Sequence, residues 1–412
     1  MKVSFISLGC AKNTVNAEQM MALCRDAGME LLSAPEGADV VVINTCGFID
    51  SAKSEAIDNI IAMGELKAEG RIGKILVTGC LSQRYKEEIL TELPEVDGVL
   101  GTGSYSEIVS AIEEVTGGGV PCRFGSIHAP VEELDRVLTT PPYIAYLRIA
   151  EGCDNHCAYC VIPSLRGKYR SRTMENVLSE AKKLAELLRE LCKMDFRWIR
   201  LHYLYPDEID DELIDTIAEE PKILKYLDIP IQHCNDEVLR AMNRRNTKEE
   251  LLELFYTLRG RIDGLVLRTS LITGLPFEDE AAFDELCRFL REVQIERAGV
   301  FPYSPEEGTR AALMENRVDT AEAERRAELV VDVQSRIMDD FNESRMGDVT
   351  EVLCEGWDAQ SMSYAGRSWA ESPDIDGRIY FTADREVADG EFVPVRITGT
   401  MDGELTGELW EE

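Results

Sequence analysis

The stretch Glu151-Gly152-Cys153-Asp154-Asn155-His156-Cys157-Ala158-Tyr159-Cys160 decides the fold, and it follows the apolar run 143–150, which predicts a strand. Its three cysteines have the spacing CxxxCxxC. Three thiolates suit a cubane cluster of four irons, because soft sulfur ligands stabilise iron and three of them leave one iron without a protein ligand. A structural zinc site would more often show two CxxC pairs or paired histidines, so zinc or idle thiols are the less favoured alternative.

Length and composition bound the other possibilities. A chain of 412 residues can hold roughly two to four domains. No opening segment has a basic head and an apolar middle, and no window approaches about eighteen uninterrupted apolar residues, so we expect a cytoplasmic protein without a membrane partner. Twelve cysteines in such a compartment, where thiols stay reduced, indicate metal ligation rather than disulfides.

The net charge of the chain indicates which kind of partner it binds. A net charge of -33 counts against RNA as the main docking partner, because phosphate binding requires Lys and Arg. A basic protein partner fits better, and we expect no direct docking of nucleic acid. The alternative is that an acidic surface only keeps the protein soluble.

Residues 1–138 alternate strands and helices in the manner of a doubly wound parallel sheet. The β-branched runs 2–8, 39–43 and 74–77 predict three of its strands, each followed by a helix-compatible segment. A cysteine follows each run: Cys10, Cys46 and Cys80. The carboxyl ends of parallel strands share one edge of an open sheet, where ligands bind, so these three thiols can converge on a second cluster.

Each of these cysteines alone would more often be a buried small hydrophobe, and that is the alternative interpretation. Glycines at positions 9, 47 and 79 favour the cluster, because they let the backbone come close to it. The other six cysteines share no such pattern and are predicted to be structural: Cys24, Cys122, Cys192, Cys234, Cys287 and Cys354.

With both cysteine trios in view, the chain resembles the methylthiotransferases, which are radical SAM enzymes that insert a methylthio group into an unactivated C–H bond. The resemblance covers nearly the whole chain. The strings 198–206 and 226–233 resemble the branch that modifies an aspartate of a small-subunit ribosomal protein. The tRNA-modifying branch typically has a serine-glycine-serine run where this chain has His233-Cys234-Asn235.

The resemblance implies two 4Fe-4S clusters and S-adenosylmethionine (SAM) as cofactors. The cluster on Cys153, Cys157 and Cys160 would generate the radical, and the cluster on Cys10, Cys46 and Cys80 would carry an exogenous sulfur. The implied substrate is the β-carbon of an aspartate in ribosomal protein S twelve, a basic protein, with a reductant such as flavodoxin or ferredoxin. The alternatives are a tRNA adenosine methylthiotransferase and a noncatalytic iron-sulfur scaffold.

Four further residues are candidates for cofactor binding: Tyr159, Arg166, Arg170 and Gln232. Tyr159 matches the family position that packs near the adenine. Arg166, Arg170 and also Arg172 could meet the SAM carboxylate or the substrate aspartate through guanidinium forks, or form an ordinary solvated face. Gln232 could orient substrate, whereas a hydrogen-bonded core role is preferred for His233.

The chain departs from the family in two places. Only five barrel strands are expected, near residues 143, 198, 226, 265 and 298, where six would be usual, because a helix predicted over 173–193 runs almost directly into Trp198. About 25 residues, one βα unit, are missing there. Either the barrel is damaged or the sequence omits a stretch; unpaired backbone in the core disfavours the first explanation. In addition, Phe277 stands where the family commonly has glycine.

The carboxyl end is expected to form a helix over 321–345 followed by a small β-barrel resembling a TRAM domain, with strands in 349–353, 379–382 and 392–397. From Arg345 onward there are five Arg, no Lys and sixteen Asp or Glu, a net of -11, which suits a cationic protein rather than RNA. The predicted organisation is therefore α/β: an N-terminal doubly wound parallel sheet (1–138), a central radical SAM partial (β/α) barrel with its linker helix (139–345), and a C-terminal small TRAM-like β-barrel (346–412).

Overall fold

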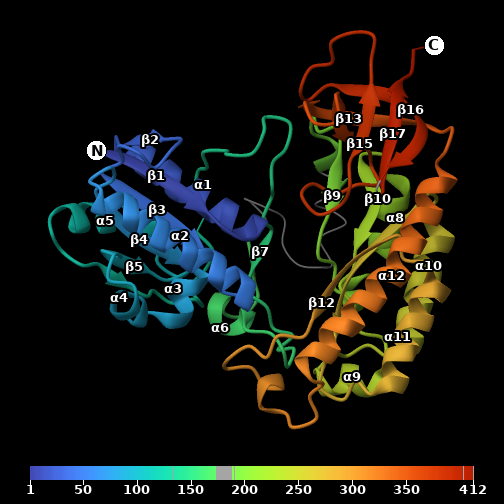
Figure 1. Cartoon of the computed structure of the whole chain (residues 1–412), viewed down its shortest axis with the longest axis horizontal. Coiled ribbons are helices and arrows are strands. Elements are labelled where there is room, and N and C mark those ends of the chain that lie inside the picture. The colour runs from blue at the N-terminus through green and yellow to red at the C-terminus, as the bar shows by residue number, and fades with distance from the viewer. Residues whose placement is uncertain (133, 173–187, 190, 402, 412) are drawn as a thin grey trace. The chain divides into compact units, whose positions relative to one another are not determined.

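The computed structural model describes residues 1–132, 134–172, 188–189, 191–401 and 403–411 (Figure 1). These residues form two compact units. The first unit is Met1–Ser179 with Ser304–Ala312, and the second is Glu180–Tyr303 with Leu313–Glu412. Among the described helices, none combines the length and apolar character needed to cross a membrane. Most of the helix predicted over 173–193 lies outside the described residues.

A parallel sheet of six strands organises the first unit, in the order β2-β1-β3-β4-β5-β6. The three strands predicted from β-branched runs are confirmed, and the shorter edge strands are additional. The strands are β1 (Lys2–Ser7), β2 (Glu30–Leu32), β3 (Val40–Thr45), β4 (Lys74–Gly79), β5 (Gly98–Leu100) and β6 (Cys122–Arg123). Because the chain starts at β1, moves out to β2 and returns to β3, the strand order reverses between β1 and β3, and ligands bind at such a switch point.

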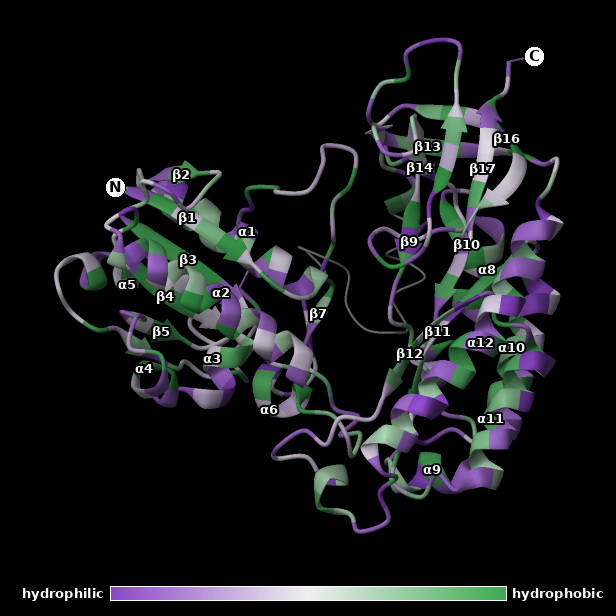
Figure 2. Ribbon diagram, viewed as in Figure 1, coloured by the Kyte–Doolittle hydropathy of each residue, from purple (hydrophilic) through white to green (hydrophobic). Residues whose placement is uncertain are grey.

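Helices cover both faces of this sheet, as a doubly wound fold requires. They are α1 (Ala11–Asp26), α2 (Asp50–Ala68), α3 (Cys80–Tyr85), α4 (Glu88–Glu92), η1 (Tyr105–Glu107) and α5 (Ile108–Thr116). Val40 and Val42 pack with α1 and α5 on one face, whereas Val41 and Ile43 pack with α2 on the other. A strand buried on both faces is apolar throughout, as the hydrophobic ribbon of β3 shows (Figure 2).

The cysteine loop of 153–160 belongs to the first unit. It lies between two short antiparallel strands, β7 (Ala150–Glu151) and β8 (Arg170–Ser171), and is followed by α6 (Ile162–Arg166). The prediction of a barrel strand over 143–150 is wrong except for its last residue. Pro141 and Pro142 precede this run without N–H groups to pair. The side chain of Arg148 hydrogen-bonds Gln19 and Glu151 within the first unit.

The segment Ser304–Ala312 is held in the first unit by a buried carboxylate. Glu306 is 4% exposed and accepts ion pairs from Lys53 and Arg84, both at 2.9 Å. Arg84 also donates to the carbonyl of Gly47, next to Cys46, at 3.0 Å. The two cations compensate the buried charge of Glu306. Because Arg84 contacts both Glu306 and the carbonyl next to Cys46, it fixes this segment beside the Cys46 turn.

In the second unit a parallel four-stranded sheet has the order β12-β11-β10-β9, one strand fewer than predicted because the 143–150 run is not part of it. Its strands are β9 (Ile199–Leu201), β10 (Ile223–Asp228), β11 (Val266–Thr273) and β12 (Arg297–Pro302). Its helices are η2 (Pro206–Glu208), α8 (Asp211–Glu219), α9 (Asp236–Ala241), α10 (Lys248–Arg261), α11 (Glu280–Val293) and α12 (Thr320–Ser344), and η3 (Ala311–Leu313) spans the boundary between the units. The alternation of strand and helix is that of a partial (β/α) barrel.

Local sequence explains where these helices begin. Asp210, Asp279 and Asp319 each accept a backbone N–H in the first turn of α8, α11 and α12, and Thr247 forms a capping box with Glu250 at α10. The helix predicted at 321–345 is confirmed as α12. In α11 the buried residues recur at helical spacing and pack on the sheet: Phe283, Leu286, Phe289, Leu290 and Val293.

The C-terminal segment is a closed β-barrel of five strands, ordered β13-β14-β15-β17-β16, which confirms the predicted small barrel. Its strands are β13 (Val349–Asp358), β14 (Ser363–Arg367), β15 (Ile379–Thr382), β16 (Phe392–Met401) and β17 (Glu404–Leu409). Alternate residues of β16, Val393, Val395 and Ile397, point into its core. β14 and β17 escaped prediction because glycine, serine and threonine interrupt their apolar pattern.

The connection between β14 and β15 packs against the amino-terminal ends of the sheet strands within the second unit. Ala370 and Trp369 join Leu224, Tyr226 and Val266 in one apolar cluster. The Tyr226 hydroxyl hydrogen-bonds Asp376 at 2.7 Å. The small barrel is therefore integrated into the second unit through this connection.

Candidate metal-cluster site

The first unit brings Cys10, Cys46 and Cys80 together at the carboxyl edge of its sheet. Cys46 and Cys80 directly follow β3 and β4, and Cys10 comes three residues after the end of β1. These strands are neighbours in register, with Ser7 opposite Asn44 and Thr45 opposite Gly79. A Cβ on Gly9 would lie 3.2 Å from the Cys46 Sγ, so glycine is needed for the first two turns to approach. The predicted convergence therefore exists, at the switch point of the sheet.

The electrostatics of this trio suit a bound cation. Burial raises the pKa of the Cys46 thiol, and the neighbouring Cys80 and Cys10 thiols raise it further, against the lowering effect of the Phe48 and Gly47 N–H groups. Positively charged irons would reverse that balance, because metal binding and thiol deprotonation are coupled.

The second trio lies on the loop between β7 and β8. This loop is closed by a hydrogen bond from the Cys153 N–H to the Gly167 carbonyl at 3.1 Å. Gly152 has φ +82°, and a side chain there would overlap the Lys168 carbonyl. The Ile162 N–H points at the Cys160 sulfur, 3.4 Å away. Backbone N–H groups directed at sulfur are a common support for iron–sulfur ligands.

Arg166 follows the second trio in the chain, contacts Cys80 of the first trio and is 3% exposed. Its Nε donates to the Cys80 sulfur at 3.4 Å, and its two Nη atoms donate to Asn16 at 2.8 Å and Asn13 at 2.5 Å. Glu151 lies 3.3 Å from the guanidinium. Burial alone would lower the pKa of Arg166, but Tyr105, Cys80 and Glu151 outweigh burial and raise it well above its usual value. Arg166 is therefore a permanent buried cation.

Both donor sets have the ligand chemistry that an iron–sulfur cluster requires. In the part of the chain that the structure describes, no three His, Cys, Asp or Glu side chains surround a point suited to one metal ion. A cubane takes each thiolate on a different iron, so its ligands need not converge on one point. Two sets of three thiols, with backbone and guanidinium donors directed at sulfur, match that requirement.

The remaining sequence-predicted residues are placed as follows. Tyr159 is half-buried next to Cys160. Arg170 donates to the carbonyl of Ile127 and to those of Arg166 and Lys168, which ties down the loop. Arg172 donates to the Arg148 carbonyl. Gln232 lies in the second unit, bridged to Leu271 of β11.

Three strained residues follow successive strands of the second unit, a feature that sequence patterns did not reveal. Tyr203, Gln232 and Phe277 have φ of +59°, +71° and +71°, and they come after the carboxyl ends of β9, β10 and β11. Non-glycine residues with such φ values cluster at ligand sites. The carboxyl edge of this sheet is also where (β/α) barrels bind their ligands. These residues therefore lie at the edge of the sheet where a (β/α) barrel binds its ligands.

Phe277 offers a direct test of this strain. We expect Phe277→Gly to exceed Phe277→Ala in free energy of unfolding by about 1 kcal/mol, because left-handed φ costs an L-residue about 1–2 kcal/mol, partly offset by the larger unfolded-state entropy of glycine. Urea titrations of both variants measure the difference. Phe301, exposed on β12 at ordinary φ, is the control, and there glycine should be the less stable. The same sign at both positions would contradict the strain.

His233 has the core role expected for it. Both His233 and Glu278 have fully buried side chains, and the His233 Nε2 lies 3.4 Å from the Glu278 Oε2. The His233 Nδ1 accepts the Asn235 N–H at 3.0 Å, so Nε2 carries the proton. Glu278 also accepts from the Gly274 N–H and from Arg326, both at 2.9 Å. This network fixes the turn after β11, which contains Phe277.

The six cysteines predicted to be structural are not all buried. Cys24, Cys234, Cys287 and Cys354 are buried, but Cys122 is exposed and Cys192 half-buried, so packing does not explain those two.

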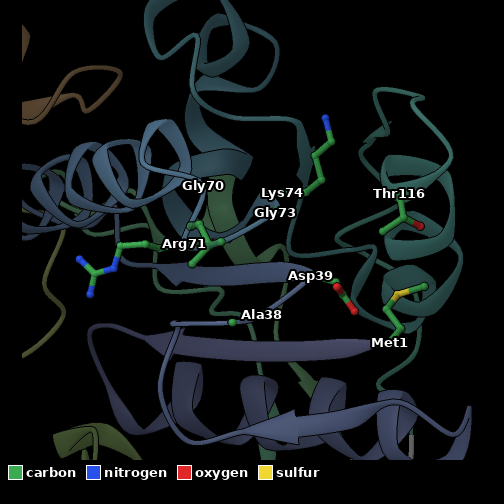
Figure 3. Close-up of a pocket in the computed structure, with 10 residues that line it drawn as sticks. Met1, Ala38, Asp39, Gly70, Arg71, Gly73, Lys74 and Thr116 are labelled. Atoms are coloured by element: carbon green, nitrogen blue, oxygen red, sulfur yellow. The ribbon is translucent and has the colours of Figure 1, made fainter.

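A depression of about 590 Å³ opens at the amino edge of the first sheet, away from Cys10, Cys46 and Cys80 (Figure 3). It is lined by Met1, Gly37, Ala38, Asp39, Gly70, Arg71, Ile72, Gly73, Lys74 and Thr116.

Comparison with known proteins identifies the family. Three family models match parts of the chain: the uncharacterized protein family UPF0004 over 2–101, the Radical SAM superfamily over 182–290 and the TRAM domain over 346–409. A ribosomal protein uS12 methylthiotransferase RimO from Caldanaerobacter subterraneus subsp. tengcongensis is 43% identical over 98% of this chain and 99% of its own. The chain belongs to the RimO family. The RimO of Clostridioides difficile is 40% identical over 100% of this chain and 99% of its own.

Solved structures agree on the fold. The radical SAM methyltransferase TsrM of Kitasatospora setae matches with a TM-score of 0.51 at 14% identity, covering 73% of this chain and 74% of its own. That identity supports the fold alone. The alignment with the Caldanaerobacter RimO extends over 436 positions, more than the 412 residues of this chain, so that RimO holds residues that this chain lacks. The observation agrees with the shortfall of one βα unit.

Proposed function

We propose that this RimO-family chain is a radical SAM methylthiotransferase acting on the β-carbon of an aspartate in ribosomal protein uS12 (S twelve). The observation that carries the proposal is the 43% identity to a uS12 methylthiotransferase over 98% of the chain. Both cysteine trios that the chemistry needs are present in the first unit. The proposed segments are 1–138 with one trio, 139–345 with the other trio and the partial barrel, and 346–412 with the TRAM-like barrel. The compact first unit differs from this division in that it also includes the loop of 153–160.

The residues of the chain have distinct tasks in this proposal. Cys153, Cys157 and Cys160 would hold one 4Fe-4S cluster, and Cys10, Cys46 and Cys80 would hold the other. When bound, the clusters and SAM supply the radical and the sulfur. Tyr159 would pack against the adenine of SAM, and Gln232 would orient bound groups at the carboxyl edge of the second unit. Arg170 keeps the cysteine loop closed through its three carbonyl acceptors.

The acidic C-terminal segment suits a basic protein as the partner. The net charge of -11 from Arg345 onward gives the TRAM-like barrel a surface that attracts a basic protein and repels nucleic acid. Arg and Lys side chains of a ribosomal protein complement such a surface. A cytoplasmic reductant such as flavodoxin or ferredoxin would supply electrons.

Mass spectrometry of uS12 tests the function. In a strain lacking this gene, uS12 should lack the methylthio group on its aspartate, and complementation should restore one group per chain. Complementation with Cys157→Ala should not restore it. Modified tRNA together with unmodified uS12 in the complemented strain would favour the tRNA methylthiotransferase. Absence of 5'-deoxyadenosine after anaerobic incubation with SAM and reductant would favour the noncatalytic scaffold.

A further inference from the structure

A buried guanidinium connects the two cysteine trios within the first unit. Arg166 ends α6, six residues after Cys160, yet its Nε donates to the sulfur of Cys80, 86 positions earlier in the chain. The contact is enclosed by apolar groups, since Cys80 packs with Val161, Leu165 and Phe48. A donor to sulfur in so dry a setting acts strongly, because little water screens it.

The same guanidinium fixes the turns that carry the other two thiols. Its Nη2 donates to the Asn13 side-chain oxygen, and the Asn13 amide in turn donates to the carbonyls of Leu8 at 2.8 Å and Thr45 at 3.0 Å. Leu8 precedes Cys10 by two residues, and Thr45 directly precedes Cys46. One side chain from the cysteine loop therefore reaches all three turns of the N-terminal trio.

Among the residues that the structure describes, the ion pairs around Arg166 do not balance in charge. Glu151 is the carboxylate nearest to Arg166, at 3.3 Å, and it also pairs with the buried Arg148 at 2.8 Å. Two cations share one anion next to Cys80. Excess buried charge is costly unless an opposite charge compensates it. A thiolate-ligated cluster on Cys10, Cys46 and Cys80 would supply the missing negative charge.

From this arrangement we infer that Arg166 is a positioning residue that sets the reduction potential of the cluster on Cys10, Cys46 and Cys80 and links that cluster's turns to the loop of Cys153, Cys157 and Cys160. The reduced cluster carries one more negative charge than the oxidised cluster, so a neighbouring cation and an N–H donor to sulfur stabilise the reduced form. Arg166 therefore raises the potential. The inference rests on the proposed function only in assuming a cluster on this trio.

The test uses the full chain with Cys153, Cys157 and Cys160 replaced by alanine, so that the N-terminal cluster alone gives the redox signal. Redox titration followed by electron paramagnetic resonance measures its midpoint potential without SAM or uS12. In this background Arg166→Met should lower the ratio of reduced to oxidised cluster at fixed poise by at least tenfold, about 59 mV for one electron. Arg25→Met is the control, because Arg25 is an exposed cation of the same unit that pairs with Asp26 on the surface, and it should leave the potential unchanged.

Glu151→Gln supplies a test of opposite sign. Removing this carboxylate leaves Arg148 and Arg166 without their shared anion, so the potential should rise. If Arg166→Met fails to fold or to bind iron, the Glu151→Gln result alone decides. An unchanged potential in the loaded Arg166→Met protein, or no rise in Glu151→Gln, would overturn the inference and leave Arg166 a structural residue. Absence of the methylthio group from uS12 in the strain complemented with the unaltered gene would instead contradict the proposed function, which this titration does not measure.

Discussion

Replacing Cys157 by alanine should abolish 5'-deoxyadenosine formation, whereas replacing Cys46 should spare it. The two cysteines belong to separate trios, one on the loop between β7 and β8 and the other at the sheet edge after β3. Loss of a supporting contact to a metal ligand costs about 10–100-fold in activity. Loss of the ligand itself should exceed that range and reduce cleavage of SAM to the level seen without protein.

The Cys46→Ala protein should cleave SAM but attach no methylthio group to uS12. Anaerobic assays with SAM and dithionite measure both products, and iron analysis should find half of the parent's cluster content in each variant. Cys122→Ala is the matched control, because Cys122 is exposed on the edge strand β6 and belongs to neither trio. The Cys46→Ala protein could also lose 5'-deoxyadenosine formation although the cluster on Cys153, Cys157 and Cys160 is still present. In that case the assignment of separate tasks to the two trios would be wrong.

The N-terminal sheet and its cysteine edge were predictable from the sequence because both depend on short-range signals. Val40 to Ile43 form an unbroken apolar run that suits only a strand covered on both faces. Once such strands are parallel, the topology itself brings the residues that follow them to one edge. The positions of Cys10, Cys46 and Cys80 followed from that rule without any knowledge of side-chain contacts.

The failed predictions involve contacts over long range. The run 143–150 has the composition of a strand, but pairing depends on which neighbours are available, and Arg148 bonds to Gln19 and Glu151 instead. Three partners of Arg166, namely Cys80, Asn16 and Asn13, lie 86 to 153 positions away, and nothing in the local sequence indicates them. The left-handed backbone at Tyr203 and Gln232 was equally hidden, because the usual signal for such a conformation is glycine.

Glu371→Gln should strongly destabilise the second unit and leave the site residues intact. Glu371 lies between β14 and β15, and its carboxylate pairs with Arg345 at 2.5 Å and with Arg297 at 3.2 Å, all three being nearly inaccessible to solvent. Burial alone would raise the pKa of Glu371, but Arg345 and Arg297 outweigh burial and lower it. Removing the charge leaves two buried cations unpaired, which costs about 3–5 kcal/mol in free energy of unfolding.

Urea unfolding followed by tryptophan fluorescence measures this loss, because Trp369 is part of the same segment. Glu391→Gln is the matched control. Glu391 pairs with Arg385 at 2.8 Å, but both side chains reach solvent, so its replacement should leave the unfolding curve where it was. Equal curves for the two variants would contradict a buried charge cluster at Glu371.

A triple variant distinguishes two possible causes of the stability that Glu371→Gln loses. If Glu371→Gln is destabilising because Arg297 and Arg345 are left buried and charged, then Glu371→Leu combined with Arg297→Met and Arg345→Met should regain most of the stability, since apolar residues of similar volume can replace a buried ion network. If the attraction itself holds the barrel to the sheet, the triple variant should remain as unstable as the single one. Arg297 begins β12, at the amino edge of the sheet, whereas Gln232 and Phe277 lie beyond the carboxyl ends of their strands. The triple variant should therefore still cleave SAM, and that result would support a stabilising connection between β14 and β15 at the edge opposite to the proposed ligand side.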